Sequence, residues 1–182
     1  MMQEQLTILK HIVSCLEQAK IAYMLSGSVA MSYYVQPRMT RDIDLVIEMQ
    51  PIHLQRLIEQ LGDDYYFDEE TARTAIAQQG MFNIIHFNSL VKIDCIVRKN
   101  STYRREEFAR RQRVMLTDFS VWIVSAEDLI LSKLYWLKDS RSELQFKDIR
   151  TLVENLPMLD WTYLQNWSQD LGILSLLEEV RP

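Results

Sequence analysis

The chain has 182 residues and a formal net charge of −5, with 48% hydrophobic and 25% charged residues. This length and composition are typical of one globular domain with a substantial core. The acidic balance argues against a protein whose whole surface grips nucleic acid. We expect neither a signal peptide nor a membrane span, because no apolar run has the required length. Cys15 and Cys95 lack metal-site or disulfide-framework spacing, so we expect both to be reduced in a cytoplasmic protein.

The first half of the chain alternates between predicted helices and strands. Apolar spacing and the positions of Pro and Gly predict, in order, a helix over 3–20, a strand over 21–25, a helix over 28–34, a loop with a turn at Pro37 over 35–40, a strand over 42–48, a helix over 52–61, and a loop over 63–70 that leads into a short helix ending near 79. Helices and strands are distinguished by whether the apolar residues recur about every 3.6 residues or every second residue.

The second half begins with strands and ends in helices. The pattern predicts strands over 81–87, 90–97, 113–116 and 119–124, followed by helices over 125–137 and 143–156, one from 160, and a short last one after Gly172. We therefore expect an α/β (α+β) fold. A mixed sheet core would span residues 1–124, and a helical part over 125–182 would pack on it as one compact unit.

The most informative residues are three aspartates on two predicted strands. Asp42 and Asp44 are two residues apart, so their carboxylates share one face of a strand. Asp94 lies in the middle of the otherwise apolar run LVKIDCIV. Carboxylates on buried strands need a partner or a metal, and oxygen ligands suit hard divalent cations. Read alone, the Asp42/Asp44 pair could instead cap a turn or pair with Arg38 and Arg41.

A Gly-Ser pair precedes these aspartates. Gly27 and Ser28 stand where a predicted strand passes into a helix. Backbone N–H groups and the positive end of the helix dipole at such a corner favour a phosphate. A phosphate site followed by a paired-carboxylate strand suggests that the protein handles a metal-bound nucleotide.

These motifs together resemble the nucleotidyltransferase superfamily related to DNA polymerase beta. RMTRDIDLVI, which contains Asp42 and Asp44, is similar to the corresponding strand of the bacterial minimal nucleotidyltransferases and AbiEii-type toxins. SAEDLILSKLYWLKDSRSELQFKDIRTL resembles the C-terminal signature of the same group. The resemblance covers roughly residues 20–155. Many relatives have two glycines where this chain has Ser26-Gly27-Ser28. The serine at this place is similar to the motif of the AbiEii-like group.

The resemblance implies a role for each matching residue. Asp42, Asp44 and Asp94 would be catalytic and would bind two Mg²⁺ ions, with Asp94 also assisting deprotonation of the acceptor hydroxyl. The nucleoside triphosphate would contact five residues, which are Gly27, Ser28, Lys133, Arg41 and Asp148. Arg141 and Lys147 would support the site from the region of the next helix.

Two basic features have an ordinary alternative. Lys133 borders the apolar stripe of an amphipathic helix, where a lysine commonly points to solvent, and only the resemblance assigns it to the nucleotide. Residues 98–113 contain seven Lys or Arg. This segment could steer an RNA or another anionic acceptor, or it could be a solvated helix balanced by Glu106 and Glu107.

The resulting hypothesis is an Mg²⁺-dependent enzyme that transfers a nucleoside monophosphate from a triphosphate to a hydroxyl acceptor. The acceptor would be tRNA or a protein, as in the toxins of this group, with an antitoxin-like protein as a possible partner. The alternatives are a small-molecule acceptor of the aminoglycoside type and a non-catalytic nucleotide- or metal-binding regulatory partner. A glycosyltransferase would account for the paired aspartates but for neither the Gly-Ser corner nor Asp94.

Overall fold

A computed structural model describes residues 2–36 and 40–181. The turn predicted at Pro37, and the pairing considered for Arg38, lie outside the described residues. The described strands are β1 (Ala22–Ser26), β2 (Asp42–Glu48), β3 (Tyr65–Tyr66), β4 (Met81–His86), β5 (Lys92–Val97), β6 (Gln112–Leu116) and β7 (Phe119–Ile123). The described helices are α1 (Met2–Gln18), α2 (Gly27–Tyr34), α3 (Pro51–Leu61), α4 (Glu69–Gln78), α5 (Thr102–Ala109), α6 (Ala126–Ser140), α7 (Glu143–Asn155), α8 (Trp161–Asp170) and α9 (Leu174–Val180).

The strands form one mixed sheet in the order β3-β4-β5-β2-β1-β7-β6. β2 pairs in parallel with β5 and antiparallel with β1, so the segment predicted to carry the paired aspartates is central. The predicted mixed α/β fold is confirmed. β3 falls where the sequence predicted a loop, because its two residues are ordered by pairing with the end of β4 rather than by a local pattern.

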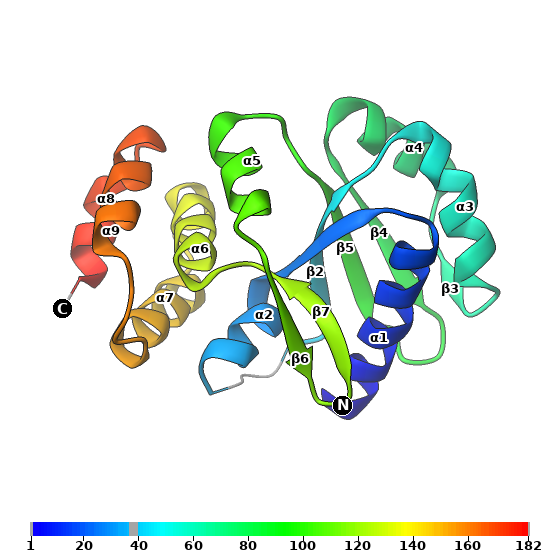
Figure 1. The fold of residues 1–182 in the computed structure, drawn as a ribbon, viewed down its shortest axis with the longest axis horizontal. Helices are drawn as coiled ribbons and strands as arrows, with labels where there is room; N and C mark the ends of the chain where they lie inside the picture. Colours follow the sequence, from blue (N-terminus) through cyan, green and yellow to red (C-terminus); the bar gives the residue numbers. More distant parts are fainter. Residues whose placement is uncertain (1, 37–39, 182) are drawn as a thin grey trace.

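Helices cover both faces of this sheet. Figure 1 shows α1, α3 and α4 on one side, with α2 and the C-terminal helices on the other. On β2 the side chains of Ile43, Leu45 and Ile47 are fully buried on one face, whereas Asp42 and Asp44 project from the opposite face. The period of two in DIDLVIE thus separates the hydrophobic core from the polar face.

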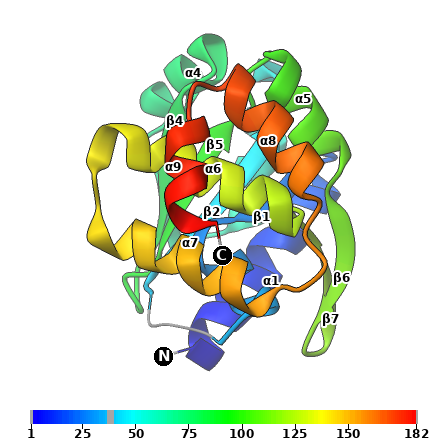
Figure 2. The ribbon, with the colours of Figure 1, turned by 90° about the vertical axis from the view of Figure 1, so that its left-hand side faces the viewer.

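The C-terminal helices α6–α9 form a layer of their own, seen face-on in Figure 2. Ser125 caps the N-terminus of α6: its hydroxyl accepts a hydrogen bond from the N–H of Asp128, as the helix-start signature predicted. One hydrophobic cluster runs from Ile8 in α1 to Val180 in α9. This continuity supports our proposal that the helical part from residue 125 and the sheet core form one unit. Within the described residues, no helix is long and apolar enough to cross a membrane.

Candidate active site

The register between β2 and β5 brings the three aspartates onto one surface. Asp44 is the direct partner of Asp94, and Asp42 is the direct partner of Lys92. Neighbouring strands lie about 4.8 Å apart, so directly paired residues on the same face are in reach of one another. Asp42 and Asp44 are partly buried, and Asp94 is 9% exposed. The site is a carboxylate cluster built on two central strands.

A glycine stands directly against this cluster. β1 ends at Ser26, which pairs with Asp44, and Gly27 then begins α2 with a φ of +63°. A Cβ atom on Gly27 would lie 2.5 Å from Cγ of Asp44 and nearer still to its Oδ2. Only glycine allows both this backbone conformation and this close approach. The N-terminus of α2, with buried Ser28 as its second residue, is thereby held beside the Asp44 carboxylate.

The electrostatics of the cluster depend on a residue that the sequence analysis did not single out. The ammonium Nζ of Lys92 lies 3.0 Å from Oδ2 of Asp94 and 3.9 Å from Oδ1 of Asp42. Its hydrogen bond to Asp94 raises the pKa of Lys92. Burial raises the pKa of Asp44, and the negative charge of Asp94 raises it further. The signal for Lys92 was present in K-I-D, because i and i+2 on a strand share a face.

Lys133 is buried in a pair with Asp148 rather than exposed on its helix. Its Nζ donates to Oδ2 of Asp148 at 2.8 Å and to Oε1 of Gln145 at 3.2 Å. The positive charge of Lys133 opposes the rise in the pKa of Asp44, which places it within electrostatic reach of the aspartates. The pair ties α6 to α7 next to the site.

Three further basic residues of the sequence prediction are exposed: Arg41, which was predicted to contact the nucleotide, and Arg141 and Lys147, which were predicted to support the site. Arg41 is exposed immediately before β2, and Arg141 and Lys147 are exposed at the end of α6 and on α7. Arg141 adopts the left-handed conformation that ends α6, with a φ of +47°. The structure thus places Gly27 against Asp44 with Ser28 next to it, and Lys133 acts on Asp44 through its charge.

Much of the basic segment 98–113 is neutralised within the chain. Arg104 binds Glu107, which is only 1% exposed, at 2.8 Å. Arg110 binds Asp128 at 3.1 Å, and Arg98 binds Glu48 at 2.9 Å. The helix expected in this segment is present as α5, and half of its residues are exposed. It is not solvated on all sides, because Tyr103, Glu107 and Phe108 are buried. The segment mainly joins α5 to α6 and the sheet.

The donor chemistry of the cluster fits a divalent cation. Oδ1 of Asp94 is buried and has no hydrogen-bond partner among the residues that the structure describes. Carboxylate oxygens are the ligands that Mg²⁺ prefers. Across residues 2–36 and 40–181, however, no three His, Cys, Asp or Glu side chains form a ready-made metal site. The side chains are arranged around a lysine ammonium, and a metal would have to rearrange them.

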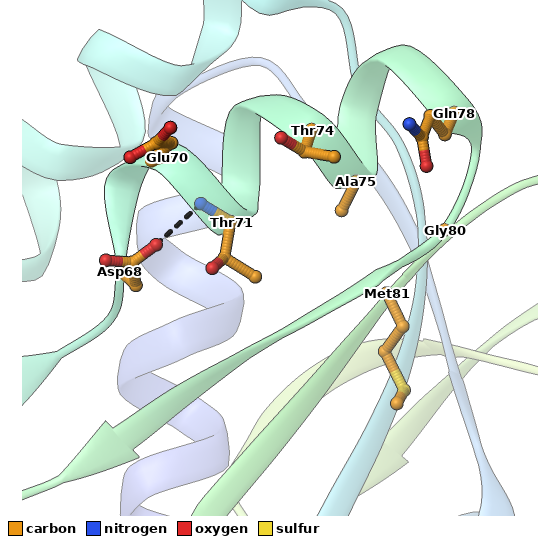
Figure 3. Close-up of a pocket in the computed structure, with 8 residues that line it drawn as sticks. All are labelled: Asp68, Glu70, Thr71, Thr74, Ala75, Gln78, Gly80 and Met81. Carbon is orange, nitrogen blue, oxygen red and sulfur yellow. Dashed lines mark hydrogen bonds between the residues drawn. The ribbon is translucent and has the colours of Figure 1, made fainter.

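A separate open depression of about 500 Å³ lies between α4 and the start of β4 (Figure 3). Oδ1 of Asp68 accepts a hydrogen bond from the N–H of Thr71 at its rim and caps α4. Its lining residues come from 68–81 and include none of the three aspartates. This depression is therefore separate from the aspartate cluster on β2 and β5.

A family model that covers nearly the whole chain places it in the nucleotidyltransferase class of enzyme. The chain belongs to the family described as "Nucleotidyltransferase of unknown function (DUF6036)", whose model matches residues 4–176. No curated protein sequence matches the chain significantly.

Several solved structures share the fold. The antibiotic-resistance factor ANT(2'')-Ia in solution has a TM-score of 0.65 at 17% identity, covering 98% of this chain and 97% of that chain. An antigenic nucleotidyltransferase-like protein from Paracoccidioides brasiliensis has a TM-score of 0.61 at 18% identity, covering 98% and 94%. The lincosamide antibiotic adenylyltransferase LnuA, bound to lincomycin, has a TM-score of 0.54 at 16% identity, covering 79% and 93%. At these identities the likeness establishes the fold alone.

Proposed function

We propose that this nucleotidyltransferase uses Mg²⁺ to transfer a nucleoside monophosphate from a nucleoside triphosphate to a hydroxyl acceptor. The observation that carries the proposal is the in-register pairing of Asp44 with Asp94, with Asp42 on the same face and Gly27 against Asp44. This arrangement supplies metal-binding oxygens and a phosphate-binding helix N-terminus at one point of the sheet.

Each residue then has a definite task. Asp42, Asp44 and Asp94 would hold two Mg²⁺ ions, and Asp94 would also accept the proton of the attacking hydroxyl. When bound, the metal supplies charge neutralisation for the transferred phosphate and the leaving pyrophosphate. The N–H groups at Gly27 and Ser28 would hold the terminal phosphates, while the ammonium of Lys133, fixed by Asp148, would add positive charge to the nucleotide site. Arg41 would contact the nucleotide from the start of β2.

Two acceptor classes follow from different observations. The local resemblance to AbiEii-type toxins favours tRNA or a protein, with an antitoxin-like protein as a further partner. The fold is shared with LnuA and with ANT(2'')-Ia, which was also determined in complex with adenylyl-2''-tobramycin. Three of the seven basic side chains of segment 98–113, those of Arg98, Arg104 and Arg110, are paired with acidic residues of the chain, which weakens this segment as a site for an RNA backbone. This observation makes a small hydroxyl compound the better-supported acceptor.

The acceptor is identified by a labelling experiment. Purified protein, Mg²⁺ and each α-labelled nucleoside triphosphate are incubated with total tRNA, with cell protein and with a small-molecule extract. Label in the small-molecule fraction supports a small hydroxyl compound as the acceptor. Label in tRNA or protein supports a toxin-like activity. Triphosphate binding without label in any fraction would instead support a non-catalytic nucleotide-binding protein.

A further inference from the structure

Lys92 occupies a central position among the three aspartates. It is the first residue of β5, two residues before Asp94 on the same face, and its direct strand partner is Asp42. Its Nζ is 3.0 Å from Asp94 and 3.9 Å from Asp42. A single ammonium therefore bridges the two strands that carry the carboxylates.

The cluster needs such a positive charge. Directly opposed like charges on neighbouring strands destabilise a sheet, and Asp44 faces Asp94 in this way. Lys133, a buried lysine on the adjoining helix α6, is bound to Asp148 of α7 at 2.8 Å. Among the described residues, Lys92 is the cation that forms ion pairs with these aspartates, and it offsets their repulsion in the metal-free protein.

A divalent metal would bind the same carboxylates that Lys92 contacts. Mg²⁺ binds carboxylate oxygens at about 2.0–2.1 Å and prefers a nearly ideal octahedral shell. The ammonium of Lys92 already holds Oδ2 of Asp94, whereas Oδ1 of Asp94 is buried without a partner in the described structure. Two cations on one carboxylate repel each other. Metal binding and the Lys92 contact are therefore in competition.

We propose that Lys92 is the resident counter-ion of the aspartate cluster and that its ammonium must leave Asp94 before a divalent metal can bind. This inference rests on the proposed function, because it takes the cluster to be the metal site. Lys92 acts as a positioning residue: its ammonium stays bound to the carboxylates until a metal displaces it. Its side chain is 37% exposed, which gives the ammonium room to move towards solvent.

The test is a titration of nucleotide-free protein with Mn²⁺, in which unbound Mn²⁺ is measured by electron paramagnetic resonance. We expect Lys92→Met to bind Mn²⁺ about tenfold or more tightly than the unchanged protein, because one repelling charge is removed. Lys92→Arg keeps the charge and should bind as weakly as the unchanged protein. Lys10→Met is the matched control, since Lys10 also pairs with an aspartate, Asp118, but in α1 on the other side of the sheet.

Thermal unfolding provides a second readout. Without metal, Lys92→Met should unfold at a lower temperature than the unchanged protein. Saturating Mn²⁺ should then raise the unfolding temperature of Lys92→Met by more than it raises that of the unchanged protein. Lys92→Gln provides a second uncharged variant should the methionine variant fail to fold.

The outcomes separate this inference from the function on which it rests. Equal Mn²⁺ affinity in the unchanged protein and the uncharged variants, with loss of binding in Asp94→Asn, would overturn the role of Lys92 and leave the metal site intact. An absence of Mn²⁺ binding in every variant would overturn both the inference and the metal half of the proposed function.

Discussion

Replacing Gly27 with alanine tests how closely the α2 corner approaches the carboxylate cluster. The added methyl would meet Cγ of Asp44 at 2.5 Å, at a position whose φ is +63°. The left-handed conformation costs alanine about 1–2 kcal/mol, and overpacking adds about 1–3 kcal/mol. We therefore expect Gly27→Ala to lower the free energy of unfolding by about 2–5 kcal/mol, and to reduce nucleotidyl transfer because Asp44 is displaced.

A second glycine separates these two contributions. Gly62 has a similar φ of +69°, but a Cβ there would have nothing within 4 Å among the described residues. Gly62→Ala should therefore cost only a conformational term, about 1–3 kcal/mol for its extended backbone with positive φ. Urea denaturation of both variants gives the difference. In an Asp44→Gly background the cost of Gly27→Ala should fall to that of Gly62→Ala. Equal costs for the two alanine substitutions in the unchanged background would refute the close approach of Gly27 and Asp44.

Further predictions concern the charges. Asp44→Asn should abolish transfer yet raise the unfolding temperature of the metal-free protein by about 2–4 °C, because it removes one of two facing negative charges worth on the order of 1 kcal/mol. Because the pKa of Asp44 is raised in the folded protein, ionisation of Asp44 costs stability, and the unchanged protein loses stability as the pH rises through that pKa. The stability advantage of Asp44→Asn should therefore vanish below about pH 3.9, the pKa of an unperturbed aspartate. An advantage that persists below this pH would contradict the assignment. Lys133→Met should lower stability by about 3 kcal/mol by removing the cation from buried Asp148, and Lys133→Met/Asp148→Leu should regain most of it; equal losses in both variants, measured by urea denaturation, would argue against the pair.

Local patterns in the sequence predicted most of the framework. The alternation in DIDLVIE fixed the bounds of β2, and the serine-acid signature at Ser125 located the start of α6. Pairing between distant segments was less accessible. β3 has two residues that are ordered by β4, and Asp128 binds Arg110 and Tyr163 from elements far away in the chain.

The site shows the same division. Periodicity placed Asp42 and Asp44 on one face, but the register that sets Asp44 opposite Asp94 depends on how two strands align across the sheet. Lys92 was overlooked because a lysine at a strand end ordinarily faces solvent, and only the β2–β5 register brings it to Asp42. The burial of Lys133 follows from the packing of α7 on α6, which the sequence of α6 alone does not contain.

If the three aspartates form the transfer site, their substitution must stop the transfer of α-label to the acceptor fraction found in the labelling experiment. The protein is compared with Asp42→Asn and Asp94→Asn, while Asp118→Asn, at an exposed turn residue paired with Lys10, is the control. The account predicts a loss of about 10³-fold or more in both site variants, unchanged transfer in the control, and folded protein by thermal unfolding in all. Transfer that persists in Asp42→Asn and Asp94→Asn at the level of the control would contradict it.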